Sequence, residues 1–143
     1  MKLLLPLFCL LSPAFGPVSA QDKRLVDVVP VAEGADALLP CALGSGLSVD
    51  QFDWRKDSGG EEKEEVFFYD KGSYYGHGRS EQYQSQQFRG RVEFFKERLE
   101  SGNASITIQN TRLEDNGTYT CVLFKPQRHE VNVRLNVVGD LIF

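Results

Sequence analysis

The stretch Asp115-Asn116-Gly117-Thr118-Tyr119-Thr120-Cys121 decides the fold of this 143-residue chain. Cys41 and Trp54 lie upstream of it. A cysteine, a tryptophan and a second cysteine preceded at two residues by tyrosine form the sequence frame of a sandwich of two antiparallel β-sheets. In this frame the tryptophan packs on an inter-sheet disulfide, and the hydroxyl of Tyr119 bonds to the backbone at a strand corner. The frame therefore predicts an all-β recognition module.

The first residues of the chain, 1–20, have the pattern of a secretory signal peptide that is cleaved. Lys2 supplies the positive start, residues 3–11 the apolar stretch, and Val18-Ser19-Ala20 the small-residue cleavage site. The apolar stretch is too short to span a bilayer, although a retained signal anchor is the alternative interpretation. Cleavage would leave residues 21–143, a length that suits one domain.

The cysteines allow a single pairing in the mature chain. Cys9 lies in the predicted signal peptide and would leave with it, so Cys41 and Cys121 remain. Their bond would close a loop of about 80 residues, worth roughly 4.5 kcal/mol in the chain-entropy model. Two free core cysteines are the alternative, which the oxidising secretory route disfavours.

Charge and hydropathy exclude several classes of partner. The formal net charge of −4 disfavours nucleic acid and anionic membranes. The acidic run of residues 61–65, interrupted by Lys63, is typical of a solvated loop. After Ala20 the sequence has no apolar run long enough for a transmembrane helix.

The sequence carries no catalytic or metal-binding motif. His77 and His129 are its two histidines, and neither lies at ligand spacing from another histidine or a cysteine. No nucleophile elbow, phosphate loop or zincin motif occurs. We therefore predict a protein without catalytic residues, cofactor, metal or small-molecule substrate. A hydrolase is kept as the enzyme-class alternative.

Short stretches of alternating apolar and polar residues, bounded by turn residues, predict β-strands along the chain. Pro30 interrupts the first of them, which suits an edge strand. Residues 71–87, rich in Gly, Ser, Gln and Tyr, are predicted to hold only a ragged strand and a loop. The predicted strands cover residues 25–31, 35–43, 52–55, 66–69, 91–95, 105–109, 118–124 and 130–138.

Three motifs resemble one group of variable-type immunoglobulin domains. They are Phe88-Arg89-Gly90-Arg91-Val92, Gly102-Asn103-Ala104-Ser105-Ile106-Thr107-Ile108, and the stretch from Leu113 to Cys121. The pattern is similar to the membrane-distal domains of the butyrophilins, of the B-seven costimulatory and coinhibitory ligands, and of myelin oligodendrocyte glycoprotein. This resemblance covers nearly all of residues 21–138 and implies a V-type (V-set) two-sheet antiparallel sandwich. The long gap between Trp54 and Cys121 agrees, because variable-type domains need more strands than constant-type ones.

The resemblance also implies a salt bridge between Arg91 and Asp115 across the bottom of the sandwich. A bidentate arginine–carboxylate pair is favourable, and its role here would be structural. Two unrelated surface charges are the alternative.

Two glycosylation sequons occur in the predicted mature chain, Asn103-Ala104-Ser105 and Asn116-Gly117-Thr118. Both fall at predicted turns, where a glycan would project into water. We therefore predict Asn103 and Asn116 as glycosylation sites.

The resemblance further implies that a protein partner binds the face of the sheet built from the strands of Trp54, Val66, Cys121 and Val133. Period two directs alternate side chains of these strands outward, and the hairpin tip of residues 125–128 would add a basic rim. The alternative is that a loop or a neighbouring domain covers Phe124. The predicted partner-binding residues are Asp53, Arg55, Val122, Phe124, Lys125 and Arg128.

By resemblance, the predicted function is that of an extracellular ligand that binds a receptor on lymphocytes and modulates T-cell receptor signalling and cytokine production. There are two alternatives: an adhesion module that pairs with another immunoglobulin domain, and a secreted decoy of such a ligand. An antigen-receptor variable chain is disfavoured, because residues 128–133 lack the Gly-x-Gly bulge of such chains. Residues 139–143 are predicted to be a truncated tail or the start of a missing segment. The expected location is the external side of the plasma membrane if a longer form carries an anchor, and otherwise the secreted fraction.

Overall fold

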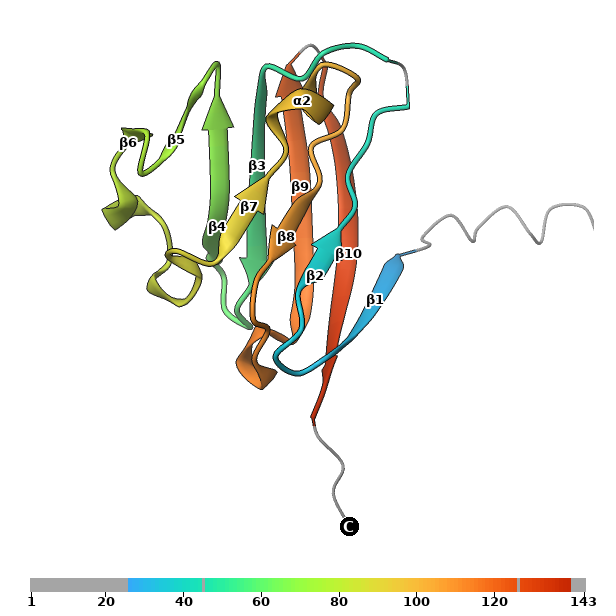
Figure 1. The fold of residues 1–143 in the computed structure, drawn as a ribbon, viewed down its shortest axis with the longest axis vertical. Helices are drawn as coiled ribbons and strands as arrows, with labels where there is room; N and C mark the ends of the chain where they lie inside the picture. The colour runs from blue at the N-terminus through green and yellow to red at the C-terminus, as the bar shows by residue number, and fades with distance from the viewer. Residues whose placement is uncertain (1–25, 45, 126, 140–143) are drawn as a thin grey trace, which may run out of the picture.

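The structure is a computed structural model that describes residues 26–44, 46–125 and 127–139. Two β-sheets pack face to face (Figure 1), and the Cys41–Cys121 disulfide lies between them. The predicted all-β V-type sandwich is therefore confirmed. The predicted signal peptide with Cys9, and residues 140–143 of the predicted tail, lie outside the described residues.

The larger sheet contains seven strands: β1 (Asp27–Ala32), β3 (Gln51–Asp57), β4 (Lys63–Asp70), β5 (Ser73–Tyr75), β6 (Gly78–Arg79), β9 (Gly117–Lys125) and β10 (His129–Val138). Their order across the sheet is β1-β10-β9-β3-β4-β5-β6. β1 runs parallel to β10 and β5 parallel to β6, while the other neighbours are antiparallel. Pro30 lies in β1, at the edge of the sheet, where a residue without an N–H is tolerated.

The smaller sheet contains β2 (Ala37–Leu39), β7 (Val92–Phe94) and β8 (Ile106–Ile108), in the order β2-β8-β7. β2 is shorter than the predicted strand of residues 35–43. Pro40 follows it and has no N–H for the ladder, and the amide of Cys41 donates to Ser105 Oγ at 3.0 Å instead. Ala37 and Leu39 point into the core while Leu38 is exposed, as the period of a strand requires.

Short helical turns connect the strands. β5, β6 and the 3₁₀ turns η3 (Glu81–Tyr83) and η4 (Gln86–Phe88) occupy the segment predicted to be ragged. The one-turn helix α2 (Lys96–Leu99) and the 3₁₀ turn η5 (Leu113–Asp115) are additional. Sequence analysis does not predict them, because four residues are too few to show a helical period. In the part of the chain that the structure describes, no helix is long and apolar enough to cross a membrane.

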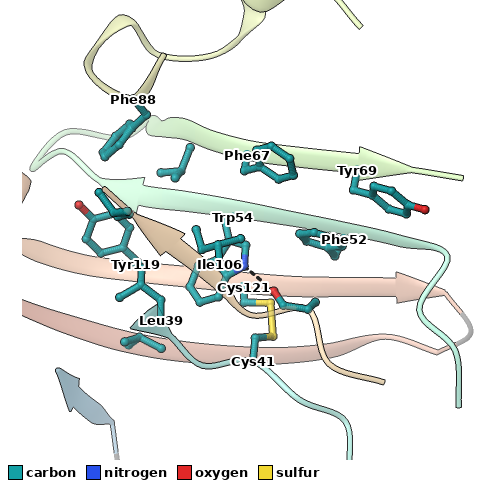
Figure 2. Close-up of a cluster of buried hydrophobic side chains, with 14 of the residues drawn as sticks. Leu39, Cys41, Phe52, Trp54, Phe67, Tyr69, Phe88, Ile106, Tyr119 and Cys121 are labelled. Atoms are coloured by element: carbon teal, nitrogen blue, oxygen red, sulfur yellow. Dashed lines mark hydrogen bonds between the residues drawn. A yellow bond between two sulfur atoms is a disulfide. The ribbon is translucent and has the colours of Figure 1, made fainter. Parts of the chain in front are cut away.

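The core lies between the two sheets and is shown in Figure 2. The Cys41–Cys121 disulfide joins the sheets, and both cysteines are buried. Trp54 is fully buried in the same cluster, and its indole Nε1 donates to the carbonyl oxygen of Ala104 at 2.9 Å. A buried indole N–H without this acceptor would cost about 1–3 kcal/mol. One hydrogen bond therefore fixes the large side chain of β3 to the segment that leads into β8 of the smaller sheet.

The strand corner expected at Tyr119 is also formed. Tyr119 is buried, and its hydroxyl donates to the carbonyl oxygen of Asp115 at 2.6 Å. The ring of Phe88 packs edge-on against it, with the ring centres 6.0 Å apart. These contacts hold the start of β9 against η5, which fixes the direction in which β9 leaves the corner.

Candidate partner-binding face

The outer side of β3, β4, β9 and β10 forms a continuous surface, which we call the front face. The strand register places Glu130, Val122, Asp53 and Phe68 opposite one another in a row that crosses all four strands. Arg55 belongs to the next row. Because Trp54 and its paired residues point into the core, their neighbours must point to this side. The fold thus gathers side chains that are far apart in the sequence.

Two half-buried aromatic rings on this side are each faced by a guanidinium group. Arg79 Cζ lies 4.0 Å from the ring centre of Phe68, and Arg128 Cζ lies 6.0 Å from that of Phe124. Cation–π attraction favours both arrangements. Val122 is half-buried as well. The front face therefore has apolar groups with basic side chains over them, and the rings are only partly open to water.

Phe68 and Arg79 were not among the predicted partner-binding residues. Period two could not single out Phe68, because the predicted strand 66–69 is apolar throughout. A register shift opposite Val66 also breaks the alternation, so that Val66 and Phe67 are both buried while Phe68 is half-buried. Arg79 had no signal either. It belongs to the two-residue strand β6, and only the pairing of β6 with β5 brings it back to the sheet.

The prediction that Asp53 is exposed to a partner is wrong. Its side chain is 3% exposed, and its Oδ2 accepts from Arg55 Nε at 2.7 Å. Arg55 also contacts Glu65 Oε2 at 3.3 Å, and its own side chain is 51% exposed. Period two gives the side of the sheet correctly, but the longer side chains of neighbouring residues cover the short aspartate. Arg55, rather than Asp53, presents charge to the solvent.

The charges at the two ends of β3 differ. At one end lie Lys125, opposite Gln51, and Arg128, which forms an exposed ion pair with Glu130 at 3.2 Å. An exposed pair of this kind contributes little to stability. At the other end is a hollow of about 530 Å³ that is lined by Arg55, Glu61, Glu62, Lys63 and Glu65. The front face therefore runs from a basic rim to a mostly acidic one.

Arg91 and Asp115 lie away from the front face and form a nearly buried ion pair. The guanidinium contacts both carboxylate oxygens, and the two side chains are 9% and 0% exposed. Gln87 Nε2 and the amide of Arg112 also donate to the carboxylate, at 2.7 and 2.8 Å. Burial alone would raise the pKa of Asp115, but the hydrogen bonds outweigh it and the pKa is lowered. This pair closes the end of the sandwich at η5.

The two sequon asparagines have different surroundings. Asn103 Oδ1 accepts from the amide of Ser105 at 3.0 Å and from its hydroxyl. Among the described residues, Asn103 Nδ2 has no acceptor. Asn116 uses both ends of its amide: Nδ2 donates to the carbonyl oxygens of Leu113 and Val137 at 3.1 and 3.4 Å, and Oδ1 accepts from Val137 N. The side chain of Asn116 therefore ties η5 to the end of β10.

The histidines and acidic groups do not form a metal site in the described residues. His77 stacks on Tyr74 with the ring centres 4.9 Å apart, and His129 begins β10 opposite Leu123. Within residues 26–44, 46–125 and 127–139, no group of three or more His, Cys, Asp or Glu side chains could hold a metal ion.

The sequence matches a family of known domains, and both the sequence and the fold are similar to those of known proteins. The immunoglobulin V-set domain family matches residues 27–138. The chain is 29% identical over 121 residues to V-set and immunoglobulin domain-containing protein 1 of Gallus gallus, and the match covers 80% of this chain and 32% of that protein. It thus spans about a third of the length of this relative.

A second relative is V-set domain-containing T-cell activation inhibitor 1 of Rattus norvegicus. The identity is 45% over 40 residues, which cover 28% of this chain and 14% of that protein. Among solved structures, the human B7-H4 IgV-like domain is similar, with a TM-score of 0.64 and 25% identity. That match covers 81% of this chain and 96% of the other.

Proposed function

Because this chain belongs to the immunoglobulin V-set family, we propose that it is an extracellular, non-catalytic ligand whose front face binds a receptor on lymphocytes and modulates T-cell activation. The observation that carries this proposal is the presence of three half-buried apolar side chains, those of Phe68, Val122 and Phe124, on a sheet face between rims of opposite charge. The similarity to a protein named as a T-cell activation inhibitor supports the choice of cell. The similarity to the B7-H4 domain supports the family of ligands.

The front face has the composition expected of a binding centre. Aromatic and arginine side chains supply most of the energy in protein interfaces, and the polar residues around them exclude water. Phe68, Phe124, Arg55 and Arg79 are of these types. The basic rim at Lys125 and the acidic hollow of residues 61–65 would steer a partner of complementary charge into one orientation.

Phe124→Asp is the substitution that tests the face. We expect binding of the fluorescently labelled, tetramerised chain to primary T cells to weaken at least tenfold, because a buried charge would replace an aromatic anchor and hot-spot losses exceed about 2 kcal/mol. Binding is measured by flow cytometry across a concentration series. Cytokine release from T cells stimulated through their receptor gives the second measurement, and it should lose its dependence on the added protein.

Leu38→Asp is the matched control, because Leu38 is 47% exposed on the opposite sheet. It should leave binding and cytokine release unchanged, and circular dichroism should show that both variants are folded. Saturable binding that Phe124→Asp does not weaken would contradict the proposed face. Absence of saturable binding to lymphocytes, together with aggregation of beads coated with the chain, would favour the adhesion alternative instead.

For the two predicted glycosylation sites, we propose that Asn103 carries a glycan and that Asn116, contrary to the prediction from its sequon, does not. A glycan replaces one hydrogen of the amide nitrogen, and at Asn116 that nitrogen already donates to two carbonyl oxygens. When the chain is secreted from mammalian cells, Asn103→Gln is expected to remove the mass released by glycosidase treatment, whereas Asn116→Gln is expected to leave it. Intact mass before and after treatment decides the point. The reverse pattern would show that Asn116 is the modified residue.

A further inference from the structure

Two carboxyl groups lie close together beneath the front face without enough hydrogen-bond donors. The side chains of Asp53 and Glu65, on the adjacent strands β3 and β4, both contact Arg55 Nε, at 2.7 and 3.3 Å, and they interact with each other. Each has one oxygen, Asp53 Oδ1 and Glu65 Oε1, that is buried and finds no donor among the described residues. Two ionised carboxylates cannot supply a donor to each other, so this arrangement is incomplete without a hydrogen atom.

If Asp53 and Glu65 were both ionised, the guanidinium of Arg55 on β3 could neutralise only one of the two negative charges. Arg55 Nε lies 2.7 Å from Asp53 Oδ2 and 3.3 Å from Glu65 Oε2, so a single guanidinium serves both carboxyls. Lys63, the other basic residue of the hollow, is directed elsewhere. Its Nζ donates to Thr120 Oγ1 at 3.3 Å and lies 3.8 Å from Asp57 Oδ1.

The groups on β5 and β6 do not supply the missing charge. The hydroxyl of Tyr75 interacts with Glu65 and lies 3.4 Å from the carbonyl oxygen of Tyr83, to which it can also donate. Arg79 stacks its guanidinium on Phe68, and its buried Nε reaches no acceptor in the described part of the chain. Arg79 is therefore not hydrogen-bonded through Nε to either carboxyl group.

We propose that Asp53 and Glu65 form a proton-binding site: at neutral pH Glu65 is a neutral carboxylic acid, and its O–H donates to the ionised carboxylate of Asp53. The other oxygen of Asp53 accepts from Arg55. The shared proton gives a hydrogen-bond partner to the two oxygens that have none, Asp53 Oδ1 and Glu65 Oε1. The cluster then carries one negative charge, on Asp53, and one positive charge, on Arg55. Carboxyl groups that share a site commonly hold one proton between them, because both cannot ionise side by side.

The electrostatics agree with this geometry. Burial, and then the hydrogen bond and charge of Asp53, raise the pKa of Glu65 to about 9, against the opposing effect of Arg55. In the unfolded chain Glu65 ionises at the ordinary value of 4.5. Between these values the folded domain holds a proton that the unfolded chain has released. Its contribution to stability is therefore fully present below about pH 4.5 and is lost as the pH rises toward 9.

This inference goes beyond the proposed function, since it concerns the domain alone and needs no partner. The direct test is ¹³C NMR of the carboxyl carbon of Glu65 in the wild-type chain, titrated from pH 4 to pH 10. We expect the signal of a protonated acid at pH 7 and a midpoint well above the ordinary glutamate range. A midpoint in the ordinary range would overturn the proposal, and this test requires no variant.

Unfolding equilibria give an independent measurement. Glu65→Gln keeps a donor toward Asp53 but cannot ionise. The ratio of the unfolding constants of the wild type and this variant should rise about tenfold per pH unit between about pH 5.5 and 8, as expected for one proton bound on folding. Glu62→Gln, an exposed change in the same hollow, should leave the pH dependence of the wild type intact. A constant ratio for Glu65→Gln would contradict the proton site.

Discussion

Replacing Asp115 with alanine is expected to lower the free energy of unfolding by about 3–5 kcal/mol, because the guanidinium of Arg91 would stay buried without its partner. The same change removes the acceptor for Gln87 Nε2 and for the amide of Arg112. Chemical denaturation of the wild type and the variant at pH 7 measures the difference. Asp115→Asn keeps the shape of the side chain but removes its charge, so its free energy of unfolding should lie between those of Asp115→Ala and the wild type.

The pH dependence of this effect has a defined sign. The pKa of Asp115 is lowered in the folded state, so its contribution is present above the unfolded value of about 3.9 and is lost as the pH falls through the folded value. The difference between wild type and Asp115→Asn should therefore shrink below about pH 4.

Glu114→Ala is the matched control for Asp115. This neighbour is 60% exposed, and its contact with Arg112 at 3.8 Å is a surface ion pair. Its removal should change stability by no more than about 0.5 kcal/mol. A loss at Asp115 as small as this would show that the Arg91 pair does not hold the end of the sandwich together.

Opening the Cys41–Cys121 disulfide should cost about 4.5 kcal/mol, the chain-entropy value for a loop with a sequence separation of 80. The measurement compares denaturation of the wild type in its oxidised and reduced forms, so that no side chain is changed. The double variant Cys41→Ala, Cys121→Ala should lose at least as much, because it also removes buried volume.

Accessibility of the sulfur atoms provides the check on this second prediction. The two sulfur atoms are bonded to each other, so neither should react with an alkylating reagent when the protein is denatured without reduction. Intact mass showing two alkylated cysteines without prior reduction would contradict the disulfide. Equal stability of the oxidised and reduced forms would contradict its energetic role.

Local pattern was sufficient for the framework of the fold. Cys41, Trp54, Tyr119 and Cys121 could be assigned from spacing alone, because a two-sheet sandwich needs each of these side chains at a fixed position in its strand. The similarity to the B7-H4 domain and to a V-set T-cell activation inhibitor confirms the resemblance to the B-seven ligands that the motifs predict. The strands were found where residues alternate over several positions, and their ends were missed where Pro40 or a side-chain hydrogen bond stops the ladder.

What the sequence determined by itself is therefore the sandwich, its disulfide, and the side of the sheet to which the residues of β9 and β10 point; in β4 a register shift breaks the alternation, and the consecutive residues Val66 and Phe67 are both buried. Period two is a property of the backbone and needs no knowledge of neighbours. Only the tertiary structure decided how deeply each side chain is buried and which side chains it contacts. Asp53 is buried beside Arg55, Glu65 on β4 interacts with Asp53, and the guanidinium of Arg79 lies over the ring of Phe68. These relations depend on the lengths of side chains from strands that are distant in sequence, and on pairings that exist only once the sheet has formed.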